Sequence, residues 1–274
     1  SPPLVLPYFG ELAPWQQTFV YLGLPGILLS VMILVIREPS RRPFLRDPES
    51  SSDTEELINF YKRNFKTIFF HHLGNLSLVL TGYAFVFWSI TFFVRVHGMS
   101  AAEASQIFGW IFIFFGPMGP FLVAYVARVL SKRGHRDANI TAGMLGGLIT
   151  IPAVLIIQIA PSPFWAFVFY APALAAVNSP FGIASGALPV ITPPHLRARV
   201  AAVYMLTGAI GMMFGPPLAG AFNEHIFPGT EGVRYSMITM TCFFGITGVV
   251  LLQLGRKHYA LTMKNTEKWE KDSE

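Results

Sequence analysis

The chain has little charge for its length and almost no cysteine. Asp, Glu, Lys and Arg make up 13% of its 274 residues, about half the share in a soluble domain, whereas 53% are hydrophobic. The single cysteine, Cys242, excludes a disulfide framework and a cysteine metal cluster, and a small buried apolar role accounts for it. The sequence has no nucleophile–base pair, metal-ligand spacing or phosphate loop. It therefore predicts neither an enzyme nor a cofactor or metal site.

Seven apolar stretches contain no Asp, Glu, Lys or Arg at all. A helix rises about 1.5 Å per residue and the hydrocarbon core of a bilayer is about 30 Å thick, so roughly 20 apolar residues cross it. In lipid the backbone must satisfy its own hydrogen bonds, so these stretches are predicted to be helices. They cover residues 15–36, 67–94, 104–127, 138–160, 164–191, 200–222 and 236–254. The sequence predicts an all-α integral membrane protein with seven transmembrane helices.

The basic residues are divided unequally between the two sides that seven crossings define. The formal net charge is +5, but 18 of the 20 Lys and Arg lie in alternate loops and the tail, and only Arg95 and Arg234 lie on the other side. Positive charge is retained in the cytoplasm during insertion. We therefore expect a multi-pass protein of the plasma (cytoplasmic or inner) membrane with a cytoplasmic C-terminus and Ser1 outside. Because the positive charge is explained by this retention, a nucleic-acid partner is not predicted. An external Ser1 is expected either as the N-terminus of a mature protein or as a cut in an external loop.

The spans and the charged stretches divide the chain into four parts. Residues 1–36 form an external segment and one helix, and residues 37–66 form a cytoplasmic linker. Residues 67–254 form a six-helix bundle, and residues 255–274 form a charged cytoplasmic tail that is only partly helical.

Two capping boxes predict helix starts. Ser52 followed by Glu55 predicts a short linker helix over residues 53–63, and Ser100 followed by Glu103 predicts the start of the third span. The linker helix is amphipathic, and we expect its apolar face to lie against the membrane surface. That face consists of Leu57, Ile58, Phe60 and Tyr61.

Proline and glycine interrupt several of the spans. Proline removes a helical hydrogen bond and bends a helix, whereas small residues four apart let helices pack closely. Either gating hinges or helix packing explains them, and kinked helices near the midplane are typical of transporters. The candidate hinge or packing residues are Pro117, Pro180, Gly211, Gly215 and Pro216.

A family resemblance rests on motifs in and after the first span and in the last third of the chain. They are Ile191-Thr192-Pro193-Pro194, Arg197-Ala198-Arg199-Val200, Tyr204, Gly211, Gly215-Pro216-Pro217, Gly23-Leu24-Pro25-Gly26, Arg37-Glu38-Pro39 and Val233-Arg234-Tyr235-Ser236. With these motifs the chain resembles Spinster-like members of the major facilitator superfamily, from about Trp15 to Leu254. The loop after the third span departs from the family pattern, because Ser131 stands where the family has an acid.

The resemblance implies a twelve-helix transporter made of two six-helix halves. The first span here is then equivalent to helix 6 and the other six to helices 7–12. The missing N-terminal half of the transporter is the implied protein partner, and membrane lipid and a small-molecule substrate are the others. Because no span contains an acid, the residues that couple transport to an ion are expected in that missing half.

Polar residues inside the spans are candidates for a substrate cavity, because polar groups in lipid usually face the bundle interior. Interhelical hydrogen bonds are the structural alternative for each of them. The candidates are Tyr83, Trp88, Asn178, Ser179, Tyr204 and Thr207. His71 and His72, one turn from the cytoplasmic start of the second span, are expected to lie at the interface.

The sequence predicts part of a secondary active transporter that moves a small organic or lipid-like solute by alternating access. A seven-helix receptor has the same helix count, although the last span lacks a lysine for a retinal Schiff base. A non-transporting membrane scaffold is the other alternative.

Overall fold

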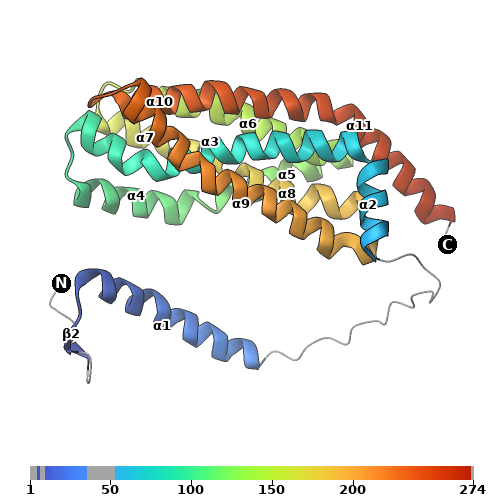
Figure 1. Cartoon of the computed structure of the whole chain (residues 1–274), viewed down its shortest axis with the longest axis horizontal. Helices are drawn as coiled ribbons and strands as arrows, with labels where there is room; N and C mark the ends of the chain where they lie inside the picture. The colour runs from blue at the N-terminus through green and yellow to red at the C-terminus, as the bar shows by residue number, and fades with distance from the viewer. Residues whose placement is uncertain (1–4, 7–9, 36–52, 273–274) are drawn as a thin grey trace. The chain divides into compact units, whose positions relative to one another are not determined.

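The computed structural model describes residues 5–6, 10–35 and 53–272 of the chain, and within these ranges it gives no side-chain surroundings for 5–6, 14, 53, 180–185 or 267–272. The chain divides into two compact units, Ser1–Pro48 and Glu49–Glu274 (Figure 1).

The first unit contains a short hairpin and one long helix. Strands β1 (Val5–Leu6) and β2 (Gly10–Glu11) pair antiparallel, and these strands were not predicted. Helix α1 (Pro14–Leu34) begins where the Gln16 side chain accepts a hydrogen bond of 2.8 Å from the Ala13 N–H. The helix has no charged residue, and a helix that is apolar on all sides is typical of a membrane span. This confirms the first predicted span over its described residues.

The second unit is a bundle of long helices that run roughly alongside one another (Figure 1). Its elements are α2 (Asp53–Arg63), α3 (Phe65–His97), α4 (Ala101–Phe115), α5 (Met118–Lys132), α6 (Ala138–Gln158), α7 (Pro163–Val177), α8 (Ser179–Ile191), η1 (Pro194–Leu196), α9 (Arg197–Ala221), η2 (Phe222–Ile226), α10 (Gly232–Met240), η3 (Thr241–Gly245) and α11 (Ile246–Asp272).

Six segments of the described residues, α1 among them, are long and apolar enough to cross a membrane. The predicted span over 164–191 is instead divided at Asn178 into α7 and α8, of which α7 counts only as a shorter apolar helix. Pro180 follows this break and lacks the N–H that would continue the hydrogen-bond ladder. All seven predicted spans are helical in the described residues, and two of them are broken, the span 104–127 at Gly116–Pro117 and the span 164–191 at Asn178.

Helix α3 holds the bundle together, since α9 and α11 both pack along it. Small residues allow this close contact: a Cβ on Gly74 would lie 2.9 Å from Leu252 Cγ, and a Cβ on Gly248 would lie 2.9 Å from the Gly74 carbonyl oxygen. At the far end of α3, the Phe93 ring stacks on Phe167 at 3.8 Å between centroids. The core of the bundle therefore runs along the whole length of α3.

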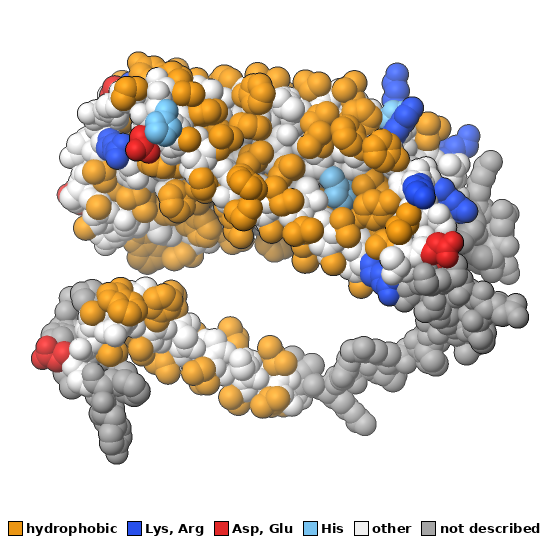
Figure 2. Space-filling view, viewed as in Figure 1, with side chains coloured by type: hydrophobic (Ala, Val, Ile, Leu, Met, Phe, Trp, Pro, Cys, Tyr) orange, Lys and Arg blue, Asp and Glu red, His pale blue; other side chains and the backbone are white. Residues whose placement is uncertain are grey.

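The basic loops of the described chain meet at one end of the bundle, which we call the basic end. The turn between α5 and α6 contacts α11 there, and α2 contacts η1 through His195 and Glu56, whose side chains are 3.0 Å apart. Figure 2 shows most of the visible Lys and Arg at this end and a broad apolar surface along the rest of the bundle. This arrangement agrees with the predicted division of basic residues between two sides.

The linker helix has the predicted bounds, but its apolar face packs mostly against the bundle and not against the membrane surface as predicted. Helix α2 lies across the basic end (Figure 1), and Phe60 is buried in the bundle core with Leu57 and Tyr61 packed around it. Only Ile58 of the predicted apolar face is exposed, at 47%. The expectation that this whole face lies on the membrane surface is therefore wrong, because the bundle covers most of it.

The predicted boundary between bundle and tail at residue 254 does not appear as a break. Helix α11 continues without interruption to Asp272. Beyond the boundary, Tyr259 is fully buried and donates a hydrogen bond of 2.8 Å to the Ala187 carbonyl, and Thr262 pairs with Thr67 at 2.8 Å. The first turns of the tail therefore belong to the bundle.

One ion pair at the basic end gives a pH-dependent prediction. Arg256 Nε lies 2.6 Å from Asp137 Oδ2, and Thr141 donates to the same oxygen at 2.9 Å. Burial raises the pKa of the Asp137 carboxyl, but these hydrogen bonds lower it more, so it lies below the ordinary value. A depressed pKa stabilises the fold above the unfolded-state pKa, and this contribution is lost as the pH falls through the folded-state value.

We expect Asp137→Asn to destabilise the bundle by about 1 kcal/mol at neutral pH, because the pair is only partly exposed. Thermal unfolding in detergent should show this difference shrinking as the pH falls below about 3.9, the unfolded-state pKa of Asp. Glu224→Gln removes an exposed carboxylate at the opposite end and is the control. A difference that does not change with pH would contradict the ion-pair explanation.

Candidate functional site

A cavity lies between α3, α8 and α9, with a volume of about 520 Å³. A smaller hollow of about 230 Å³ lies between α3, α4 and α7, and the two share Val79 and Tyr83. We call them together the α3 cavity. Its lining residues are Asn75, Val79, Gly82, Tyr83, Val86, Phe112, Val177, Asn178, Leu188, Pro189, Thr192, Arg197, Ala201, Tyr204, Met205, Gly208, Ala209 and Met212.

Helical spacing explains which face of each helix lines this cavity. On α3 the residues Asn75, Val79 and Tyr83 follow one another at intervals of four, so they lie in one row. On α9 the row begins with Arg197 and passes through Tyr204. Two rows of mostly small or apolar side chains therefore face each other, with polar groups at intervals.

The polar groups of the larger hollow gather toward the basic end. Arg197 begins α9 there, and its Nε donates a hydrogen bond of 3.2 Å to the Thr192 carbonyl. Thr192 in turn donates through its hydroxyl to the Leu188 carbonyl at 2.7 Å. The cavity thus has an apolar wall and one cationic, hydrogen-bonding end, which suits a ligand with both apolar and polar parts.

A group of buried polar side chains adjoins this end. Tyr204 and Asn75 both line the cavity, and the Tyr204 ring lies 5.4 Å from the His71 ring and 5.5 Å from the His72 ring. Among the described residues, neither ring nitrogen of His71 or of His72 has a hydrogen-bond partner, nor does Asn75 Oδ1. His71 is fully buried within the bundle, and its expected depth at the membrane interface stays a prediction. The turn of helix that carries it is covered by α2 and α9.

Of the six predicted cavity residues, the structure brings three together. Tyr83 lines both hollows, Asn178 lines the smaller one, and Tyr204 lines the larger one. Asn178 also caps the end of α7, where its side-chain amide donates to the Leu174 carbonyl at 2.8 Å. These three side chains come from α3, from the break between α7 and α8, and from α9.

The other three candidates lie apart from the α3 cavity. Trp88 Nε1 donates to the Pro216 carbonyl at 2.9 Å, which joins α3 to α9 near the opposite end. Ser179 is buried against Gly146 of α6, and the Thr207 hydroxyl donates to the Val203 carbonyl of its own helix at 3.1 Å. Hydrogen bonds account for Trp88 and Thr207, whereas Ser179 is packed against α6 and its buried hydroxyl has no hydrogen-bond partner among the described residues.

Comparison with solved structures identifies the fold. The chain is similar to a bacterial homologue of the human lysosomal transporter Spinster in an inward-facing and unoccupied conformation, with a TM-score of 0.56, 23% identity, and coverage of 93% of this chain and 60% of that one. The inward-facing and occupied conformation also gives a TM-score of 0.56, with 22% identity and coverage of 94% and 59%. The chain has the fold of the matching 60% of these structures, which is part of the major facilitator fold. This confirms the predicted fold class.

The chain spans about 60% of the length of these two structures. At this level of identity the similarity establishes the major facilitator fold and not an activity. No protein-family model and no curated protein sequence matches the chain.

Two interruptions divide membrane-spanning segments of this major facilitator fold. Helix α4 ends at Phe115 with Gly116 as its C-cap, and Pro117 is the N-cap of α5. Helix α7 ends at Val177 with Asn178 as its C-cap, and Pro180 stands in the first turn of α8, where its side-chain surroundings are not described. Both breaks occur at or beside predicted hinge residues, and their role as hinges stays a prediction.

The remaining hinge or packing candidates all lie on α9, which runs without interruption through Pro216. A Cβ on Gly211 would lie 2.7 Å from Val79 Cγ1, and a Cβ on Gly215 would lie 2.6 Å from the Leu80 carbonyl oxygen. Pro216 supplies the carbonyl that Trp88 binds. In this conformation these residues hold α9 against α3.

Sequence reasoning did not select Asn75, Thr192 or Arg197 as cavity residues. Asn75 lies two turns before Tyr83 on the same face of α3, so helical spacing from one candidate could have found it. Arg197 was counted among the retained positive charges and in a motif of the family resemblance, and not as a cavity residue. A larger cavity, of about 830 Å³, lies elsewhere at the basic end and contains none of the predicted residues.

Proposed function

We propose that the chain is the C-terminal part of a secondary active transporter that moves a small organic or lipid-like solute by alternating access. The observation that carries this proposal is the α3 cavity, an apolar hollow with one cationic end, within a major facilitator fold. In this proposal α1 is equivalent to helix 6 and the bundle to helices 7–12. The N-terminal half would supply the other wall of the cavity and the residues that couple transport to an ion.

The lining of the α3 cavity suggests the chemistry of the solute. Val79, Leu188 and Met212 offer an apolar wall, whereas Asn75, Tyr204 and Arg197 offer hydrogen bonds and a positive charge toward one end. A solute with an apolar body and an anionic or hydrogen-bonding head fits both parts. The breaks at Gly116 and Asn178 lie in the helices that border the smaller hollow, where bending would change its width.

The charge distribution supports an orientation for this transporter. If the basic end faces the cytoplasm, as retention of positive charge favours, the C-terminus is cytoplasmic and the cationic end of the cavity is near the inner face. The expected membrane is the plasma or inner membrane. A seven-helix receptor and a non-transporting scaffold gain no support from the fold.

Uptake into proteoliposomes tests the proposal. The chain would be reconstituted together with the N-terminal half and offered labelled single-chain amphiphiles, such as lysophospholipids with anionic or neutral heads. We expect uptake of at least one anionic amphiphile, and we expect Arg197→Gln to reduce it about tenfold because a cationic group at the head is lost.

The matched control is Arg199→Gln, which removes the same charge from the same turn at a residue that does not line the α3 cavity. If both variants lost the same share of uptake, the effect would come from the overall positive charge and not from a contact of Arg197 with the solute in the α3 cavity. Absence of flux for every amphiphile in liposomes with correctly inserted protein would reject the transporter proposal.

A further inference from the structure

Buried polar atoms without hydrogen-bond partners are concentrated beside the basic end of the α3 cavity. Of the thirteen such side-chain atoms in the described residues, six belong to four residues at this place. They are the Tyr61 hydroxyl, both ring nitrogens of His71 and of His72, and Oδ1 of Asn75. Buried polar atoms in proteins are nearly always hydrogen-bonded, so a group of six unpartnered atoms indicates a place where a further polar molecule binds.

These four residues form one cluster, which we call the polar recess. The Tyr61 ring of α2 lies 6.3 Å from the His72 ring and covers the recess from the basic end. Asn75 follows His71 at a spacing of four, so both lie on one face of α3, and they are 1% and 0% exposed. Asn75 and Tyr204 line the α3 cavity, and the Tyr204 ring contacts both imidazoles. The recess therefore lies directly behind the cavity wall.

Arg197 supplies a positive charge at the same end of the cavity. Its Nε donates to the Thr192 carbonyl at 3.2 Å, and no acid in the described part of the chain forms an ion pair with it. The residues that line the larger hollow include no Asp or Glu. The other N–H groups of the guanidinium are therefore available to an anionic group of a solute.

The atoms of the polar recess match hydroxyl groups better than they match a quaternary ammonium group. A neutral imidazole has one N–H donor and one acceptor nitrogen, the Asn75 Oδ1 accepts, and the Tyr61 hydroxyl does both. A solute hydroxyl also donates and accepts. A quaternary ammonium group has neither a donor nor an acceptor, and the charge of Arg197 would repel it.

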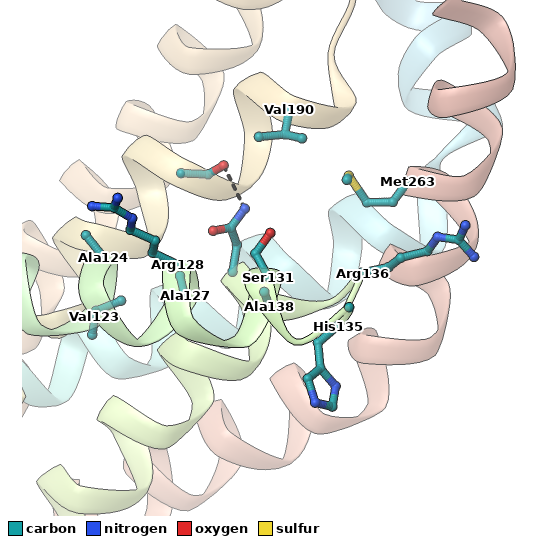
Figure 3. Close-up of a pocket in the computed structure, with 13 residues that line it drawn as sticks. Val123, Ala124, Ala127, Arg128, Ser131, His135, Arg136, Ala138, Val190 and Met263 are labelled. Carbon is teal, nitrogen blue, oxygen red and sulfur yellow. Dashed lines mark hydrogen bonds between the residues drawn. The ribbon is translucent and has the colours of Figure 1, made fainter. Parts of the chain in front are cut away.

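The larger cavity at the basic end does not offer this combination. Its asparagine, Asn139, already donates to the Gly186 carbonyl at 3.0 Å, the hydrogen bond drawn in Figure 3. In the same view the Arg128 and Arg136 side chains point away from each other. None of the described residues that line this cavity has a buried side-chain atom without a partner.

We propose that the polar recess binds hydroxyl groups of the solute's head, so that the α3 cavity selects amphiphiles whose anionic phosphate carries a hydroxylated group such as glycerol. Arg197 binds the phosphate, and the Asn75 Oδ1 accepts a hydrogen bond from the first hydroxyl. His71 and His72 bind the second hydroxyl when the Tyr204 ring turns aside. This inference rests on the proposed function, because it takes the α3 cavity as the solute site.

Two lipids of equal charge test the proposal. Lysophosphatidylglycerol and lysophosphatidylmethanol with the same acyl chain both carry one negative charge, but only the first has hydroxyls beyond its phosphate. Native mass spectrometry of the purified chain in detergent would compare their binding. We expect lysophosphatidylglycerol to bind about tenfold more tightly, because the other lipid leaves the buried polar atoms unpaired. Equal binding of the two lipids would overturn the proposal.

Variants of the recess locate the preference. We expect Asn75→Leu to reduce it to about twofold or less, because the acceptor is lost while the side chain keeps its approximate size. Binding of lysophosphatidylmethanol should stay within about threefold, since Arg197 and the apolar wall are unchanged. The double variant His71→Phe/His72→Phe should lower the preference by about threefold. A full preference in folded Asn75→Leu would overturn the proposed role of the recess.

The matched control is Gln158→Leu at the opposite end of α6. Gln158 is also a buried amide, 1% exposed, whose Oε1 has no partner among the described residues, but it lines neither hollow of the α3 cavity. It should leave the preference within about twofold of the unchanged chain. Equal losses in Gln158→Leu and Asn75→Leu would show a general effect on the fold and would overturn the proposal.

Uptake by the reconstituted transporter separates this proposal from the proposed function. A binding preference that depends on Asn75, without flux of any amphiphile, would support the recess as a head-group site and reject transport. Equal binding and equal uptake of the two lipids would support transport and reject selection by the polar recess.

Discussion

Gly215→Ala is expected to destabilise the bundle by about 3 kcal/mol, the largest single-methyl effect that we predict. The added Cβ would lie 2.6 Å from the Leu80 carbonyl oxygen and 3.3 Å from Leu80 Cα. Both are backbone atoms of α3, so no change of side-chain rotamer can relieve the overlap. Helix α9 would have to move away from α3 along their shared length. The midpoint of thermal unfolding in detergent or nanodiscs measures the effect.

Two comparisons make this prediction specific. Gly208→Ala on the same helix meets no atom within 4 Å, so it should be neutral or raise stability by up to about 1 kcal/mol through helix propensity. Gly211→Ala meets the Val79 side chain at 2.7 Å, and Val79→Ala should restore most of its loss. If Gly215→Ala and Gly208→Ala unfolded at the same temperature, the close packing of α9 against α3 at Gly215 would be contradicted.

Hydropathy was sufficient to predict the helical spans, because the requirement for about 20 uncharged residues holds whatever the helices pack against. It could not predict where the last helix ends. The apolar run stops near Leu254, yet α11 continues because Tyr259 and Thr262 are buried against neighbouring helices. The buried residues Leu252, Gly255, Tyr259 and Thr262 recur at helical spacing. This periodicity indicates that one face of the helix is buried, although the many charged residues of the tail suggested a break from the bundle.

The environment of α2 shows a second limit. An amphipathic helix has the same periodicity whether its apolar face meets a bilayer surface or a protein core. The capping signal placed the helix at the correct residues, but only the structure shows that Phe60 enters the bundle.

Three of the six predicted cavity residues line the α3 cavity, because the sequence predicts which side chains face the bundle interior but not which neighbouring helix they face. A polar residue in an apolar span is expected to face the interior of the bundle, and Tyr83, Asn178 and Tyr204 do so at the α3 cavity. Trp88 and Ser179 also face inward, but they contact α9 and α6 instead. A helix inside a bundle has several inward directions, and the sequence of one helix does not say which neighbour lies along each.

Filling the α3 cavity gives the strongest functional prediction. Gly208 lines the larger hollow, and a Cβ there meets no atom within 4 Å. Gly208→Trp should therefore place an indole in the cavity without disturbing the contact of α9 with α3. If the cavity holds the solute, we expect uptake by the reconstituted transporter to fall at least about a hundredfold, because the apolar wall is covered.

The matched control is Gly109→Trp on α4, where a Cβ also meets no atom within 4 Å but the residue does not line the α3 cavity. It should keep uptake within about twofold. Both variants should unfold within a few degrees of the unchanged chain, which separates a blocked cavity from a damaged fold. If Gly208→Trp transported normally while it stayed folded, the solute would have to pass elsewhere, and the proposed role of Asn75, Tyr204 and Arg197 would be wrong even if the chain belongs to a transporter.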